Sequence, residues 1–291
     1  MTITLAHLGP QGTYAEVATL AVAHWLEQQG HSTPTLCPYG SIAQTLYAVE
    51  QGETMFAVVP VENSTEGSVR DTLDTLWQLD DIRVQQAWTL PITHALISCA
   101  EKVESIQTVF SHPQALAQCH DWLQGHLPTV HRVATQSTTK ALEHLTALGR
   151  NSHEAGAIAS KRAAELYNLP IVAYPVNDHP DNCTRFWVIG QMDVEYADQT
   201  APATHCSLAF SLPKNCPGAL LNTLQIFADR QINLSRIESR PTKRSLGEYL
   251  FFMDIERDMN DGLMQEALEE LQQCTETLKV FGRYRVLQAQ A

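Results

Sequence analysis

The sequence predicts an α/β protein in two parts, and three observations lead to this prediction. Apolar segments of strand length alternate with helical patterns over residues 1–190, as in proteins with a largely parallel sheet. Residues 191–204 are polar, include Pro202 and show no periodicity, which is typical of a linker. Over residues 205–287 the expected order changes to β-α-β-β-α-β, so we expect a second, smaller domain there.

Local patterns indicate each element of the first part. Residues 3–8 form a short apolar strand, and the helix after it carries Ala15, Ala18 and Val22 on one side. The apolar run at 55–61 is typical of a strand covered on both faces. The other expected helices are 71–79, 113–124, 138–148 and 160–167, and the other expected strands are 92–98, 107–110, 155–159, 171–174 and 185–190.

The second part begins with a strand in which Leu208, Phe210 and Leu212 alternate with other residues. Pro217-Gly218 then opens a helix. Two strands at 233–239 and 248–256, a helix over 263–271 and a last strand near 278–287 follow. This order is that of a ferredoxin-like domain.

The composition limits the classes of partner. The chain has 291 residues and a formal net charge of −13, from 32 acidic and 19 basic side chains. Such a surface repels nucleic acid and anionic lipid, so we expect neither nucleic acid nor a membrane as a partner. An anionic ligand would have to be met by cations or backbone amides placed locally.

Cysteine usage and the first residues indicate the compartment. Seven cysteines are scattered without a CxxC pair or a framework of spacings, which argues for reduced thiols and against a zinc site. The start of the chain lacks the features of a signal peptide, and no apolar run approaches the roughly 20 residues that span a bilayer. The sequence therefore predicts a cytoplasmic protein.

Polar residues follow the apolar strand at 55–61. Ligands of open α/β sheets bind beyond the carboxyl ends of strands, which is where Glu62 and Asn63 lie. These two side chains could hold a substrate hydroxyl. Ser64 and Thr65, taken alone, are better explained as caps of the next helix.

Two further loops place hydroxyl groups ahead of helices. Ser111 precedes a helix that contains Gln118, and the amides at the helix start could bind a carboxylate. Ser137 and Thr138 form a similar cluster before the next expected helix. Helix capping alone would explain one serine in each loop, so both explanations stay open.

Two other segments offer groups for an anion. The Gly-rich turn at 9–13 joins a strand to a helix, so its amides could face an anion or it could simply need glycine. Thr184 and Arg185 precede an apolar strand, and the Arg185 guanidinium suits a carboxylate, although it could be an ordinary surface arginine. Together these loops suit a small dianionic organic acid, and no aspartate is placed to complete a Ser-His-Asp triad.

These segments resemble the prephenate dehydratase family. In the first part the resemblance lies in LGPQGT (8–13), VPVENSTEGS (59–68), SHPQALAQC (111–119) and TRF (184–186). The second part resembles the family's ACT domain through PGAL (217–220), IESRP (237–241) and LGEY (246–249). Because nothing precedes the first strand, we expect the monofunctional form without a fused chorismate mutase.

The resemblance implies a fold and a reaction. Two α/β lobes would enclose the active site, as in a type II periplasmic binding protein. The first lobe would hold 1–76 and 176–190, the second 77–175, and the ACT domain 205–287. The reaction would be the decarboxylative dehydration of prephenate to phenylpyruvate in phenylalanine biosynthesis. No metal or organic cofactor would be needed, L-phenylalanine would be the allosteric inhibitor, and the chain would form a homodimer or homotetramer.

The resemblance also implies roles for particular residues. The catalytic residues would be Thr184, Glu62, Asn63, Ser111 and Gln118. Those in contact with substrate would be Arg185, Phe186, Ser64, Thr65, Ser137 and Thr138. The effector would contact Pro217, Gly218, Ala219, Leu220, Glu238, Ser239, Arg240 and Pro241. Thr184 would donate either a hydrogen bond or a proton to the departing hydroxyl, and a hydrogen bond is the easier to defend.

Three alternatives stay open. A solute-binding protein has the same two-lobed build, and a regulatory protein could carry the same domains without activity. An arogenate dehydratase would act on the amino counterpart of prephenate. Cys183 and Trp187 depart from the usual family pattern beside the expected ring pocket, so the sequence does not decide between the two substrates.

Overall fold

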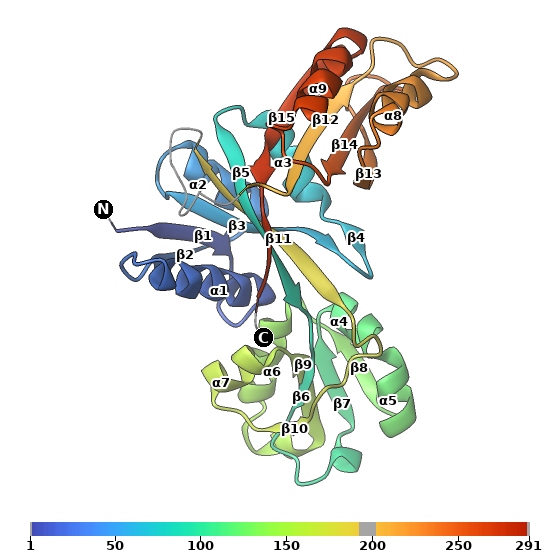
Figure 1. Ribbon diagram of the computed structural model, residues 1–291. Coiled ribbons are helices and arrows are strands. Elements are labelled where there is room, and N and C mark those ends of the chain that lie inside the picture. The colour runs from blue at the N-terminus through green and yellow to red at the C-terminus, as the bar shows by residue number, and fades with distance from the viewer. Residues whose placement is uncertain (1, 192–201, 290–291) are drawn as a thin grey trace.

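In the computed structural model, which describes residues 2–191 and 202–289, the chain forms three sheets placed one after another (Figure 1). A seven-stranded sheet lies in the middle, a five-stranded sheet lies on one side of it and a four-stranded sheet on the other. The linker expected at 191–204 falls largely outside the described residues. No helix of the described part is long and apolar enough to cross a membrane.

The middle sheet forms the first lobe and has the order β16-β5-β11-β3-β1-β2, with β4 paired to β3. Its strands are β1 (Thr4–Leu8), β2 (Thr35–Tyr39), β3 (Phe56–Asn63), β4 (Gly67–Ser68), β5 (Ile82–Pro91), β11 (Cys183–Gln191) and β16 (Val286–Gln288). Helix α1 (Tyr14–Gln28) packs on one face through a cluster that includes Val22, Leu26 and Phe186. Helices α2 (Ile42–Glu50) and α3 (Arg70–Gln78) cover part of the other face, together with the third sheet.

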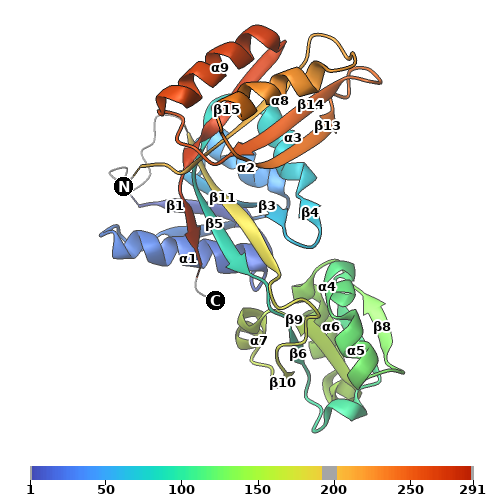
Figure 2. The same ribbon diagram turned by 45° about the vertical axis from the view of Figure 1, so that its right-hand side comes forward.

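The second lobe is built on the sheet β10-β6-β9-β7-β8. Its strands are β6 (Ala95–Ile97), β7 (Thr108–Ser111), β8 (His131–Ala134), β9 (Ala155–Ala159) and β10 (Ile171–Ala173). Its helices are α4 (Pro113–Gln118), α5 (His120–His126), α6 (Thr138–Ala147) and α7 (Lys161–Tyr167), with short 3₁₀ turns η1 (Val103–Ser105) and η2 (Gly149–Glu154). The chain crosses between the lobes twice, at residues 92–94 and 174–182 (Figure 2).

The lobe boundary expected at residue 77 is wrong. Strand β5 pairs along its length with β11 and therefore belongs to the first lobe, so the second lobe starts after Pro91. The helix expected at 113–124 is two helices, because the Asp178 carboxylate accepts hydrogen bonds from the amides of Asp121 and Trp122 and so starts a new helix. Elements that were not predicted are β2, α2, β4, β5 and β8.

The third sheet belongs to the small C-terminal domain, and its predicted ferredoxin-like order is confirmed. The elements are β12 (His205–Ser211), α8 (Ala219–Asp229), β13 (Leu234–Pro241), β14 (Tyr249–Ile255), α9 (Gly262–Cys274) and β15 (Thr277–Tyr284). Helices α8 and α9 pack on one face of this sheet. Its other face shares a continuous apolar cluster with α2, α3 and the middle sheet, through Ala209, Leu250, Phe252 and Phe281.

The end of the chain returns to the first lobe. Strand β16 pairs with β5 in parallel, so the expected last strand at 278–287 is in fact two strands in different sheets. At Gly282, which has φ +142°, a β carbon would lie 2.4 Å from the Val84 carbonyl oxygen. This close approach holds β15 against β5 and requires glycine. The small domain is therefore docked on the first lobe over an apolar interface.

Strand β11 contributes side chains to both faces of the middle sheet. Its side chains alternate between the two faces of the middle sheet, as in any strand. Phe186 and Val188 pack in the cluster under α1, whereas Trp187 and Ile189 pack in the cluster shared with the small domain. Thr184 and Arg185, at the start of the strand, consequently point in opposite directions.

Candidate active site

A group of neutral polar side chains lies where β3 and β11 run out of the first lobe toward the second. Thr184 is paired directly with Asn63, the last residue of β3. Thr184 is 8% exposed and Asn63 is 6% exposed, so their hydrogen bonds are formed in a largely dry environment. Gln118, the last residue of α4, reaches this group from the second lobe.

The orientation of Asn63 is fixed by the backbone. Its Oδ1 accepts hydrogen bonds from the amides of Thr65 and Glu66 at 3.0 and 3.1 Å. Backbone amides can only donate, so this atom must be the oxygen. Asn63 Nδ2 then donates to Thr184 Oγ1 at 2.9 Å and to Asn182 Oδ1 at 3.0 Å.

Gln118 joins the two lobes. Its Nε2 donates to Thr65 Oγ1 at 3.0 Å, and Thr65 Oγ1 donates in turn to Asn63 Oδ1 at 2.7 Å. Its Oε1 accepts from Asn182 Nδ2 at 3.1 Å. Asn182 lies in the second crossing between the lobes, so one amide group contacts both lobes and the crossing.

This arrangement leaves the Thr184 proton available. A lone pair of Thr184 Oγ1 is occupied by Asn63, and no acceptor among the described residues takes the hydroxyl proton. The hydroxyl is therefore poised to donate to a ligand. Because donor and acceptor directions are fixed in advance, little reorganisation is needed when charge develops on a departing oxygen.

Two of the other predicted residues have their hydroxyl groups engaged elsewhere. Ser111 is fully buried and donates to the Ile158 carbonyl at 2.6 Å inside the second lobe. Ser64 Oγ donates to Asn182 Oδ1 at 3.3 Å and accepts from the Cys183 amide at 3.0 Å. Ser64 thus supports the polar group around Asn182, while Ser111 lies outside it.

Ser137 and Thr138 lie at the start of α6. Ser137 caps this helix by accepting from the Lys140 amide at 3.0 Å, and Thr138 is the first helical residue. The start of α6 presents free amides, which favour anions. An open cavity of about 460 Å³ beside it is lined by Thr135, Gln136 and Lys140, among others.

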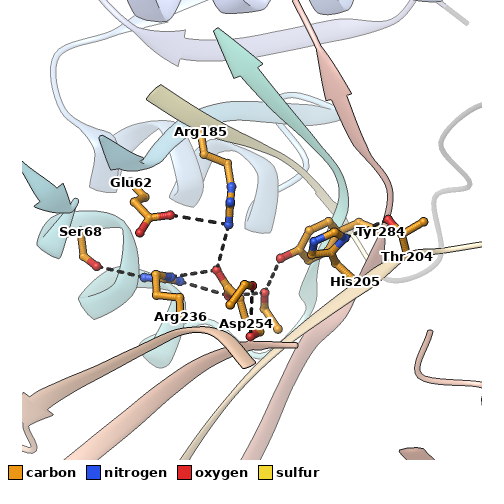
Figure 3. Close-up of polar contacts among 10 residues, drawn as sticks. Glu62, Ser68, Arg185, Thr204, His205, Arg236, Asp254 and Tyr284 are labelled. Atoms are coloured by element: carbon orange, nitrogen blue, oxygen red, sulfur yellow. Dashed lines mark hydrogen bonds and ion pairs between the residues drawn. The ribbon is translucent and has the colours of Figure 1, made fainter. Parts of the chain in front are cut away.

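The structure places Glu62 and Arg185 away from this group, on the opposite face of the sheet. Arg185 Nη1 lies 3.6 Å from Glu62 Oε2 and 3.5 Å from Asp254 Oδ2, and Asp254 belongs to β14 of the small domain (Figure 3). Neither side chain contacts the group around Thr184, so the catalytic role of Glu62 and the substrate contact of Arg185 stay predictions that this arrangement does not support. The physical reason is the alternation of side chains along β3 and β11.

Asp254 is the centre of a charged junction between the first lobe and the small domain. Its carboxylate is fully buried and accepts two hydrogen bonds from Arg236, at 2.8 and 3.2 Å, and one from Ser207 at 2.6 Å. Arg236 also donates to Ser68 Oγ of β4 at 3.1 Å (Figure 3). We call Glu62, Arg185, Arg236 and Asp254 the charged junction; it holds two positive and two negative groups.

Phe186 and Trp187 also lie away from the ligand side. Phe186 is 2% exposed and packs under α1 as a core residue, so its assignment to substrate contact is corrected. Trp187 is fully buried on the side of the small domain, with the Arg236 guanidinium 5.8 Å from its ring. Its side chain therefore packs on the opposite side of the sheet from Phe186.

The small domain contains a cavity of about 670 Å³. Gly218, Ala219 and Leu220 line it, together with Ser245, Glu248 and other residues of the loop before β14. Gly218 has φ +84° and precedes α8, so the start of this helix faces the cavity. This part of the predicted effector site is open to a small ligand.

The other predicted effector residues do not line this cavity. Pro217 is not among its lining residues, and Glu238, Ser239, Arg240 and Pro241 lie on β13 at the edge of the sheet. Arg240 instead forms a forked pair with Asp74 of α3, at 3.0 and 2.9 Å. Burial raises the pKa of the Asp74 carboxyl, but the bonds from Arg240 and Lys243 outweigh it and lower that pKa overall.

Several residues of these sites were missed by sequence reasoning. Asn182 lies two positions before Thr184, so its spacing from the threonine was a usable signal. His94 and Tyr14 extend the polar group, and Asp254 centres the charged junction, but each comes from a segment that carried no motif. Among the described residues, no group of three or more His, Cys, Asp and Glu side chains could hold a metal.

The fold and the site define a two-lobed α/β enzyme with an attached ligand-sensing domain. Residues 5–194 match the family model for prephenate dehydratase, and residues 207–273 match the model for the ACT domain. The chain belongs to the prephenate dehydratase family of lyases and carries an ACT domain.

Individual relatives agree with this assignment. A prephenate dehydratase from Methanocaldococcus jannaschii is 38% identical over 278 residues, which cover 95% of this chain and 96% of the relative. The crystal structure of the Arthrobacter aurescens prephenate dehydratase in complex with L-Phe has a TM-score of 0.85 and 32% identity, covering 97% of this chain and 90% of that one.

A second similar structure has another activity in its name. GqqA, described as a quorum-quenching acylase, has a TM-score of 0.81 and 27% identity, covering 97% of this chain and 98% of that one. The architecture alone therefore does not fix the substrate. In this chain His94, which joins the group around Thr184 through Gln118, hydrogen-bonds Tyr14 and Gln118, not a serine or a carboxylate, which does not favour hydrolysis by a Ser-His-Asp triad.

Proposed function

We propose that the chain converts prephenate to phenylpyruvate in phenylalanine biosynthesis, and that L-phenylalanine inhibits this reaction through the ACT domain. The observation that carries the proposal is the orientation of Thr184. Asn63 holds its oxygen at 2.9 Å, so the hydroxyl proton faces the region where a ligand would lie between the lobes. A biosynthetic role of this kind also supports a place in the cytoplasm.

The reaction requires little covalent chemistry from the protein. The bond from C1 to the ring carboxylate breaks, its electron pair enters the ring, and the C4–O bond breaks as hydroxide leaves. With one proton taken up, the products are phenylpyruvate, carbon dioxide and water. Aromatisation drives the reaction, so the protein has to orient the ring and stabilise the departing hydroxide.

The residues around Thr184 fit this requirement. A threonine hydroxyl is a poor general acid at neutral pH, but its hydrogen bond strengthens as negative charge develops on the leaving oxygen. Thr65, Asn63 and Gln118 hold that hydroxyl in place. The start of α6, with Ser137 and Thr138, is where we place a substrate carboxylate, because its amides favour an anion.

The test is phenylpyruvate formation from prephenate by the purified protein, followed by absorbance in alkali. We expect turnover with prephenate and less with arogenate. Preference for arogenate would change the substrate, and binding of prephenate without turnover would favour a solute-binding or purely regulatory protein.

Inhibition by L-phenylalanine is supported by three features. The cavity beside Gly218 has room for an amino acid, and the relative from Arthrobacter aurescens was crystallised with L-Phe. In addition, Asp254 of the ACT domain contacts Arg185, the direct neighbour of Thr184. A change in the ACT domain that moves β14 would therefore reach the catalytic strand through one ion pair.

Calorimetry and an inhibition curve test this regulation together. We expect L-phenylalanine to bind with an affinity similar to its inhibition constant, since linkage makes the two effects reciprocal. Binding without inhibition would separate the ACT domain from catalysis.

The ACT domain is also where we place a contact between copies of the chain. Leu221 is 65% exposed, and Ile237, Leu246 and Tyr249 are exposed on the same domain. Large apolar side chains left exposed on one domain favour an interface, so we propose a homodimer or homotetramer. Light scattering coupled to size-exclusion chromatography measures the mass directly, and a monomer would contradict the proposal.

A further inference from the structure

We propose that His94 is a positioning residue, which fixes Gln118 and, through Thr65 and Asn63, the direction of the Thr184 hydroxyl. This inference deepens the proposed function and rests on it. The motifs that resemble the family do not include His94, and its imidazole does not contact Thr184 directly.

The imidazole lies in the first crossing between the lobes, between β5 and β6. It is 2% exposed, and its Nε2 lies 2.9 Å from Gln118 Oε1. Its Nδ1 lies 3.0 Å from the hydroxyl of Tyr14 on α1, and the two rings meet edge to face at 5.5 Å. The Tyr14 hydroxyl also contacts the Thr93 carbonyl at 2.8 Å.

The tautomer of His94 follows from the backbone. The amides of Thr65 and Glu66 fix Asn63 Oδ1 as an acceptor, so Asn63 Nδ2 must donate to Asn182 Oδ1. Asn182 Nδ2 must then donate to Gln118 Oε1. Since Gln118 Oε1 is an acceptor, His94 Nε2 must carry a hydrogen and donate it.

The chain of bonds from His94 therefore runs in one direction. His94 Nε2–H donates to Gln118, and Gln118 Nε2–H donates to Thr65. Thr65 donates to Asn63, and Asn63 donates to Thr184. Each group is held as a donor by the one before it, and the last free proton is that of Thr184.

This chain orients groups and does not carry protons. The amides of Gln118 and Asn63 stand between His94 and Thr184, and an amide does not exchange a proton at neutral pH in the way an imidazole does. Burial lowers the pKa of His94, while the bond to Gln118 opposes this less strongly. Burial likewise raises the pKa of Tyr14.

Removing the imidazole would release Gln118 Oε1 from one of its two donors. The amide could then turn, and the donor to Thr65 would be lost for part of the time. The effect should appear in kcat and not in KM, because Thr184 meets the departing oxygen chiefly in the transition state.

The test compares kcat and KM for His94→Leu and His94→Gln, with folding checked by circular dichroism. We expect kcat to fall about 10–100-fold in the leucine variant, as when an outer partner of a functional group is lost, with KM changed less than about threefold. Glutamine offers an N–H near the position of Nε2, so we expect the glutamine variant to recover at least half of the decrease in log kcat seen with leucine.

His7→Leu is the matched control. His7 is also buried, at 1% exposed, but it contacts only the carbonyl of its neighbour Leu8 among the described residues, at 3.1 Å, and takes no part in the chain. We expect its kcat to stay within about twofold of wild type. An equal fall in both leucine variants would show a general effect of losing a buried histidine and would overturn the proposal.

A double-mutant cycle tests the route through Gln118. We expect His94→Leu to add little to the loss caused by Gln118→Leu, because residues that act as a unit are non-additive. Full additivity would overturn the proposal. If His94→Leu does not fold, the cycle is run with His94→Gln in its place, and full additivity there would likewise overturn the proposal.

The wild-type protein in the same assay distinguishes a failure of the positioning role of His94 from a failure of the proposed function. If wild type turns over prephenate and His94→Leu does so equally well, the positioning role is wrong and the proposed function stands. If wild type has no turnover, both are wrong.

Discussion

Thr184 and Arg185 are neighbours in β11, yet their side chains enter surroundings of opposite character. Thr184 faces the region between the lobes among neutral amides and hydroxyls, where each hydrogen bond has a fixed direction. Arg185 faces the ACT domain in the charged junction, where Asp254 is fully buried. One strand thus carries a neutral, directional site on one face and an ionic contact with the sensing domain on the other.

The difference suits the two tasks. Neutral groups with fixed directions stabilise charge that appears only during a reaction, without paying for reorganisation. Buried charges, by contrast, are costly when either partner moves, so the charged junction responds strongly to small shifts. We infer that β11 couples the two sites, since a shift of the strand at Arg185 is passed to Thr184 through the peptide bond that joins them.

The largest expected effect is on stability, in Asp254→Ala. This change leaves Arg236 buried without its carboxylate, and breaking a buried pair in this way costs about 3–5 kcal/mol. Chemical unfolding followed by circular dichroism measures the loss. The control is Glu143→Gln, which removes the exposed partner of Lys140 and should cost less than about 0.5 kcal/mol. An equal decrease in the free energy of unfolding in both variants would show that the charged junction is not a strong contact.

Activity should change most in Thr184→Val, which keeps the shape of the side chain and removes its donor. Losing one such donor costs about 10²–10³-fold in kcat. Steady-state kinetics with prephenate measure the change. Thr184→Ser keeps the hydroxyl and should retain most of the rate, whereas a valine variant with more than a tenth of wild-type kcat would rule out the assigned role.

A smaller effect is expected on the pH dependence of stability. Burial lowers the pKa of His94 in the folded state, so below its unfolded value of 6.5 the unfolded chain binds the proton more readily. The contribution of His94 to the free energy of unfolding is therefore at its maximum above pH 6.5 and decreases as the pH falls. His94→Gln should therefore lose less stability than wild type between pH 7.5 and 5.5. Chemical unfolding at both pH values measures this difference.

The other histidines with lowered pKa values do not disturb that comparison. Burial also lowers the pKa of His7 and His205, but both are present in the two proteins and cancel. Parallel pH curves would mean that His94 is not held neutral by burial.

Much of the fold could be predicted because its elements have clear patterns, such as the apolar run of β3 and the order of the ACT domain. Strand β5 was missed because Gln86 breaks the alternation in which Arg83 and Gln85 separate apolar residues, although two neighbouring strands cover its edges. The second strand at the chain end, β16, pairs with a distant element, and no local signal reports such a pairing.

The candidate site, like the fold, could be predicted only in part. Asn63, Gln118 and Thr184 were named from motifs, and the structure brings them together. Arg185 and Glu62 stand beside them in the sequence but lie on the other face. Strand alternation could have predicted their separation, but the partner on that face, Asp254, comes from another domain and carried no motif.

The most direct test of the coupling through β11 is the inhibition curve of Arg185→Gln for L-phenylalanine, measured beside wild type. This variant keeps Asp254 paired with Arg236 and leaves the neutral group untouched. We expect turnover within a few-fold of wild type, and a half-inhibiting concentration raised at least about fivefold, the lower end of usual coupling energies. Inhibition identical to wild type, or a loss of turnover as large as that of Thr184→Val, would contradict the account.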